Sequence, residues 1–131
     1  MIMLDTNAWI WWLSAPNELS PKALAAVERG VQESEVYVSS ISVWEAALLV
    51  ERGRLVLSMP FNDWLSRCES LPFLHFVPVD NRIAVRAVHL PGDFHKDPAD
   101  RIITATAMEK NLLLVTLDRK LRGYPHVRTV W

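Results

Sequence analysis

The chain has 131 residues, of which half are apolar and 22% are charged, the ordinary balance of a globular domain. This length allows one domain with a substantial core and hardly two, so we expect a single domain over residues 1–131. The formal net charge of -1 excludes a general electrostatic attraction for polyanions, so such binding would need local basic patches or a metal ion.

The N-terminal region lacks the pattern of a signal peptide, because it has no basic stretch and Asp5 interrupts its first apolar run. The longest apolar run, Ala8–Leu13, is too short to cross a bilayer. The one cysteine, Cys68, cannot form an internal disulfide and is more typical of a packed or surface residue than of a nucleophile. We therefore expect a cytoplasmic protein that does not associate with membranes.

Short apolar runs alternate with helical patterns along the chain. In chain order, we predict strand 1–4, helix 6–14, helix 21–32, strand 35–39, helix 40–52, an extended link at 55–57, helix 61–70, strand 75–79, helix 81–88, a loop at 90–96, helix 98–110, strand 112–116 and strand 127–130. This alternation is typical of βα units with a parallel sheet. It predicts an α/β fold: a three-layer α/β/α domain with a central, mainly parallel sheet of about four to five strands.

The first predicted helix is rich in tryptophan. Trp9, Trp11 and Trp12 lie within four positions, so their rings project from more than one side of the helix. Burial on both sides is the favoured interpretation, and a surface that meets a partner or a second copy is the alternative.

Four acids carry the functional hypothesis, and each has a structural alternative. Asp5 and Asp118 directly follow predicted strands, where each could cap the next turn. Glu45 has capping-box spacing from Ser42. Asp100 lies three positions after Asp97, which could be the N-cap of the helix that begins at Pro98.

Together the four acids indicate a metal site. Strand ends and helix starts of a parallel α/β sheet meet at one edge, where ligand sites form. Carboxylates packed there repel one another unless a cation neutralises them, and oxygen ligands favour Mg²⁺ or Mn²⁺, which support phosphodiester hydrolysis. The four histidines are too dispersed to form a zinc site, and His95, beside the acidic turn, is a minor candidate for substrate contact.

Several segments in order along the whole chain resemble the PIN-domain family, above all the VapC-type toxins of type II toxin–antitoxin pairs. They are Leu4-Asp5-Thr6-Asn7, Ser42-Val43-Trp44-Glu45-Ala46-Ala47, the run from Asp97 to Ala107, Val115-Thr116-Leu117-Asp118-Arg119-Lys120-Leu121, Tyr124-Pro125 and Trp131. The resemblance implies a PIN fold and a Mg²⁺- or Mn²⁺-dependent endoribonuclease that cleaves structured RNA, such as tRNA or rRNA, and arrests translation.

The resemblance also implies roles for individual residues. Asp5 and Asp100 would be the firmest metal ligands, Glu45 would complete the metal site or orient the attacking water, and Asp118 would bind metal less tightly or through water. The hydroxyls of Thr6 and Thr116 would support the site. Asp97 stays open between a cap and a contributor to the site.

The implied partners are an RNA substrate, a VapB-like antitoxin whose tail occupies the active groove, and a second copy of the chain in a homodimer. Five cations near the acids in sequence are candidate RNA contacts, with ordinary surface charge as the equal alternative: Lys96, Arg101, Arg119, Lys120 and Arg122. Two other functions remain open. One is a haloacid-dehalogenase-like phosphatase, although such enzymes usually have a second Asp where this chain has Asn7. The other is a non-catalytic PIN-like scaffold that binds RNA or protein.

Overall fold

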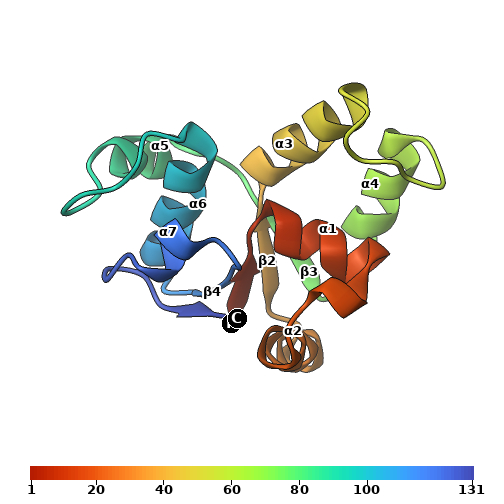
Figure 1. Cartoon of the computed structure of the whole chain (residues 1–131), viewed down its shortest axis with the longest axis horizontal. Coiled ribbons are helices and arrows are strands. Elements are labelled where there is room, and N and C mark those ends of the chain that lie inside the picture. Colours follow the sequence, from red (N-terminus) through yellow and green to blue (C-terminus); the bar gives the residue numbers. More distant parts are fainter.

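A computed structural model describes all residues 1–131 and contains one five-stranded sheet (Figure 1). Every strand pair is parallel, and the spatial order is β3-β2-β1-β4-β5. The strands are β1 (Ile2–Leu4), β2 (Val36–Ser39), β3 (Leu74–Val77), β4 (Leu113–Val115) and β5 (Thr129–Val130). The predicted α/β/α architecture is confirmed, with β1 at the centre of the sheet.

Helices cover both faces of this sheet. They are α1 (Thr6–Ser14), α2 (Pro21–Glu33), α3 (Ser40–Glu51), α4 (Phe61–Glu69), α5 (Asn81–Val88), α6 (Pro98–Glu109) and α7 (Arg119–Arg122), with a 3₁₀ turn, η1 (Pro16–Glu18), where we expected a loop. Figure 1 shows α1, α2 and α4 to one side of the strands and α5, α6 and α7 to the other. None of these helices combines the length and apolar character needed to span a bilayer.

The alternation of side chains along β1 explains why the core has two halves. Ile2 and Leu4 pack in the largest apolar cluster, with residues of α1, α2 and α4. Met3 points to the opposite face and packs with Ile103 of α6 and Leu121 of α7. A fully buried central strand must be apolar on both faces, as the opening run of the sequence is.

The tryptophans of α1 belong mainly to the core. Trp9 is fully buried, and its ring lies 4.9 Å from that of Trp64 in α4. Trp11 and Trp12 are half-buried, with Trp11 5.9 Å from Trp131 and Trp12 5.9 Å from Phe73. The structure thus favours burial on both sides of the helix over an exposed surface that meets a partner or a second copy.

Some predicted boundaries were wrong. β3 ends at Val77 because Pro78 has no backbone N–H to donate to a ladder. Residues 55–57 join no strand, and β5 is only two residues long. Cys68 is buried in α4, and burial raises the pKa of its thiol to about 11, which suits a packed residue and not a nucleophile.

Candidate active site

Asp5 is both a helix cap and a member of the acidic site. It directly follows β1, and its Oδ1 accepts a hydrogen bond from the backbone N–H of Ala8 at 2.9 Å, which caps α1. Its Oδ2 accepts from the Thr116 hydroxyl at 2.5 Å, just beyond the end of the neighbouring strand β4. The two interpretations of Asp5 from the sequence are therefore compatible, and Thr116 fixes the carboxylate orientation.

Glu45 bonds across to another helix instead of back to the start of its own. The N-cap of α3 is Ser39, so Glu45 lies in the second turn and the capping box that we considered with Ser42 is absent. The Thr6 hydroxyl lies within hydrogen-bond distance of Glu45 Oε1 and 2.9 Å from Ser42 Oγ. A hydroxyl carries one proton, so Thr6 donates to the Glu45 carboxylate and accepts from Ser42.

Asp100 is held by the start of α6 and by a histidine. Asp97 caps α6, with its Oδ1 accepting from the Asp100 backbone N–H at 2.9 Å. His95 Nε2 lies 2.7 Å from Asp100 Oδ2, and the His95 ring stacks on Phe94 at 4.5 Å. The cap role of Asp97 is thus observed, whereas His95 contacts the acidic site more closely than the sequence indicated.

Asp118 begins α7 and caps it. Its Oδ1 accepts from the backbone N–H groups of Lys120 at 2.8 Å and Leu121 at 3.3 Å, and its own N–H donates to Thr116 Oγ1 at 3.1 Å. Thr116 therefore links the two acids that follow the central strands, Asp5 and Asp118.

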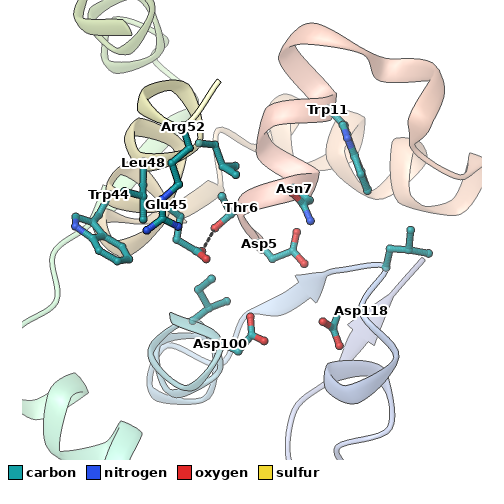
Figure 2. A pocket seen from close by; sticks show the side chains of 13 residues that line it. Asp5, Thr6, Asn7, Trp11, Trp44, Glu45, Leu48, Arg52, Asp100 and Asp118 are labelled. Atoms are coloured by element: carbon teal, nitrogen blue, oxygen red, sulfur yellow. Dashed lines mark hydrogen bonds between the residues drawn. The ribbon is translucent and has the colours of Figure 1, made fainter. Parts of the chain in front are cut away.

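The four acids line one open pocket of about 420 Å³. Figure 2 shows the carboxyl groups of Asp5, Glu45, Asp100 and Asp118 directed from four separate elements toward a common space. The four acids therefore converge at one edge of the sheet, as we expected. Of the three residues expected to support the site, Thr6 lines the pocket. Neither Thr116, which is buried, nor Asp97, which is exposed, lines it.

The environment of this pocket disfavours negative charge. Burial, above all, raises the pKa of Asp5 from 3.8 to about 6, although the bonds from Thr116 and Ala8 oppose the rise. Burial also raises the pKa of Glu45 and of Asp100, and the neighbouring carboxylates add to each of these rises. A bound cation would relieve this mutual repulsion.

The donor set fits a hard divalent ion. The oxygen donors at the pocket include four carboxylates, the ligand type that Mg²⁺ and Mn²⁺ prefer, and no histidine or cysteine lines it. No three acidic, histidine or cysteine side chains already surround a single point as direct ligands. Mg²⁺ usually takes one or two carboxylates and completes its octahedron with water and substrate oxygens, so the separation of these acids is compatible with it.

The pocket also has lining residues to which the sequence analysis assigned no role at the site. Asn7, Trp11, Trp44 and Arg52 line it beside the acids. Trp44 is 59% exposed, which is unusual for so large an apolar side chain, and Arg52 is the C-cap of α3. The place of Trp44 beside Glu45 in the sequence could have indicated that Trp44 lines the pocket. Arg52 lies two helical turns beyond Glu45, so no local sequence signal connects it to the acids.

Arg101 has a structural role, so we remove it from the candidate RNA contacts. Its guanidinium donates to four backbone carbonyls, those of Ala87 at 2.8 Å and of Val88, Phe94 and His95 at 3.1 Å each. These bonds tie the loop that carries His95 to the end of α5. The other four candidates are exposed: Lys96, Arg119, Lys120 and Arg122.

Comparison with known proteins agrees with this geometry. The family model described as "PIN domain" matches residues 2–127, which is nearly the whole chain. The chain belongs to the PIN-domain family. It is 39% identical over 132 residues to "Ribonuclease VapC22" from Mycobacterium tuberculosis, covering 99% of this chain and 98% of that protein.

Two solved structures show the same PIN fold over essentially the full length. The DNA-bound VapBC from Salmonella typhimurium matches with a TM-score of 0.69 and 21% identity, over 99% of this chain and 98% of that one. VapBC2 from Rickettsia felis, bound to a fragment of its promoter DNA, matches with a TM-score of 0.69 and 18% identity, over 100% of this chain and 99% of that one. At these identities the likeness concerns the fold alone.

Proposed function

We propose that this single PIN domain is a Mg²⁺- or Mn²⁺-dependent endoribonuclease and the toxin of a VapBC-type pair, which cleaves structured RNA such as tRNA or rRNA. The observation that carries the proposal is the convergence of four carboxylates from distant segments on one open pocket. The family membership supports it, as does the printed name of the 39% identical relative, a ribonuclease.

The proposed mechanism assigns a task to each acid. Asp5 and Asp100 would hold the divalent ion, and Asp118 would support it. When bound, the ion supplies positive charge that stabilises the charge developing on the phosphate. Glu45, steadied by the Thr6 hydroxyl, accepts a proton from the attacking water, and its raised pKa moves it toward the range useful for a general base.

The proposed partners follow from the relatives. The solved neighbours are named as toxin–antitoxin or VapBC complexes, which supports a VapB-like antitoxin for this chain. A homodimer and antitoxin occupation of the acid pocket are part of the same proposal. The apolar wall of the pocket, with Trp11, Trp44 and Leu48, gives a protein segment something to pack against.

The test compares RNA cleavage by matched variants after removal of antitoxin. We expect the parent to cleave tRNA or rRNA with Mn²⁺, and Asp5→Asn and Asp100→Asn each to lose at least about 100-fold in rate while keeping the fold. Asp80→Asn is the control, because Asp80 caps α5 as Asp5 caps α1 but does not line the pocket. This control should cleave at the parent rate.

Other outcomes would change the assignment. Full RNA cleavage in excess EDTA would reject the metal mechanism. Phosphate release from small phosphomonoesters without RNA cleavage would favour the phosphatase, and a folded parent with neither activity would favour the scaffold.

A further inference from the structure

A second hollow, of about 480 Å³, lies beside α7. We call it the basic hollow. Its lining residues come from α2, α7, β5 and the end of the chain: Lys22, Arg119, Arg122, Gly123, Thr129, Val130 and Trp131. Three basic and no acidic side chains thus line one hollow in a protein whose net charge is -1.

The three cations are not paired with acids. The ion pairs of the structure involve the N-terminus, Arg29, Arg82, Arg86 and His95. Lys22, Arg119 and Arg122 take part in none of them, and all three are exposed. Their charges are therefore available to an anion from solution.

The basic hollow adjoins the acid pocket at two places. Asp118, which lines the acid pocket, is followed at once by Arg119, and Arg122 lies three positions on, on the same face of α7. In addition, Trp11 of the acid pocket lies 5.9 Å from Trp131 of the basic hollow, ring to ring. A polymer that crosses the acid pocket can therefore continue over Trp11 and Trp131 into the basic hollow.

The chemistry of this hollow suits nucleic acid. A chain of phosphates bound at the acids alone would meet negative charge, so the attraction must come from nearby cations. Cations beside an aromatic side chain are the usual combination for single strands, because the cations bind phosphates and the ring stacks on bases. Resting on the proposed function, we propose that Lys22, Arg119 and Arg122 bind the phosphate backbone of a single-stranded RNA segment next to the phosphate to be cleaved.

The candidate RNA-binding cations that lie near the acids in sequence do not all lie in the basic hollow. Arg119 and Arg122 face the basic hollow together with Lys22, which lies in α2, far from any of the acids in sequence. Lys120 lies on another side of α7 and lines a smaller hollow with His95 and Tyr124.

The experiment measures binding of a fluorescein-labelled 15-nucleotide oligouridylate by anisotropy at several KCl concentrations, in an Asp100→Asn background that keeps RNA intact. The test variant combines Lys22→Ala, Arg119→Ala and Arg122→Ala. The control combines Arg54→Ala, Arg67→Ala and Lys110→Ala, which removes the same charge from exposed, unpaired positions that line neither hollow. Circular dichroism establishes that both variants are folded.

We expect the test variant to bind at least about ten-fold more weakly at 100 mM KCl, and the slope of log K against log[KCl] to become shallower by about 2, since each phosphate contact contributes ~0.7 on single strands. The control should change affinity less than about two-fold. A charge-keeping variant, Lys22→Arg with Arg119→Lys and Arg122→Lys, should retain the parent slope.

A test variant that matches the control in affinity and slope would overturn the inference while leaving the proposed function intact, provided the parent binds and cleaves RNA. Unchanged RNA binding together with lost binding of an oligoglutamate peptide would also overturn it, in favour of an acidic protein segment. A parent that neither binds nor cleaves RNA would overturn both proposals.

Discussion

His95 is held in place more firmly than a surface histidine needs to be. Its ring stacks on the ring of Phe94. The Arg101 guanidinium lies over the Phe94 ring, 5.5 Å from its centroid. Tyr124 packs edge-on against Phe94 at 4.9 Å and donates to the Pro91 carbonyl at 2.5 Å. The loop before α6 is thus fixed, and with it the hydrogen bond from His95 to Asp100.

We expect His95→Ala to weaken Mn²⁺ binding about ten-fold, because groups that orient a metal ligand typically contribute that much to affinity. His95→Gln should restore part of the loss, since its amide can still donate to Asp100. Titration of the free Mn²⁺ signal by electron paramagnetic resonance measures this without RNA. His89→Ala is the control, because His89 is exposed and its ring hydrogen-bonds to the Val85 carbonyl of its own helix and not to an acid. Equal Mn²⁺ affinity in His95→Ala and the parent would contradict the positioning role.

At the same scale, the sequence indicated which acids gather and, through the family resemblance, that the Thr6 and Thr116 hydroxyls support them, but not which carboxylate each hydroxyl binds. Asp5, Glu45, Asp100 and Asp118 were identified from strand ends, helix starts and family motifs. The hydroxyl pair around Glu45 depends on the packing of α1 against α3, which no local spacing encodes. The four carbonyls around Arg101 equally depend on where the loop folds, and its position beside the acids in sequence gave no sign of them.

Among the elements, α2 lies unusually close to the sheet. Gly30 faces the strands, and a methyl group at this position would lie 2.8 Å from Ile2 Cγ1 and 3.0 Å from Val36 Cγ2. A residue that weakens helices in general is therefore required by packing here.

We expect Gly30→Ala to lower the free energy of unfolding by about 1–3 kcal/mol, because overpacking outweighs the gain of up to about 1 kcal/mol in helix propensity. Urea unfolding followed by circular dichroism measures the change. Glu28→Ala, exposed on the same helix, is the control and should change stability by less than about 0.5 kcal/mol. A Gly30→Ala protein more stable than the parent would show that α2 can move away from the sheet at little cost.

Most elements were predictable because their patterns are strong and local. The caps at Ser20 and Asp97, and the terminator at Gly53 with φ 70°, are the signals that the sequence shows. The errors fall where tertiary contacts decide. β5 has only the partner strand β4 to define it. The start of α3 at Ser40 was predicted correctly, but the capping box considered for Ser42 and Glu45 is absent because Ser39, at the end of β2, caps this helix.

On the scale of the whole molecule, the buried carboxyl group of Asp5 makes the free energy of unfolding depend on pH. Asp5 has a pKa of about 6 in the folded protein and 3.8 as its ordinary value. The unfolded chain therefore releases this proton first, and stability declines as pH rises from about 4 to 6, by up to about 3 kcal/mol from this residue. Above that window the loss is complete, and below it the contribution is fully present.

We expect the metal-free protein in EDTA to be less stable at pH 7.5 than at pH 5, and Mn²⁺ at pH 7.5 to recover the difference by neutralising the acids. Asp5→Asn should be more stable than the parent in EDTA at pH 7.5, since it keeps an acceptor for the Ala8 N–H without the buried charge. Urea unfolding at the two pH values measures both effects. A parent whose stability rises between pH 5 and pH 7.5 in EDTA would contradict this account.

The bond between Asp5 and Thr116 joins positions 111 residues apart, across the adjacent central strands β1 and β4. During synthesis, the acid at the beginning of the chain emerges from the ribosome long before its partner is translated. A polypeptide released early thus carries Asp5 and Glu45 without Thr116 or Asp118, and its sheet lacks β4. Completion of the last strands is therefore what brings all four carboxylates to the pocket, and a chain that ends before β4 cannot assemble it.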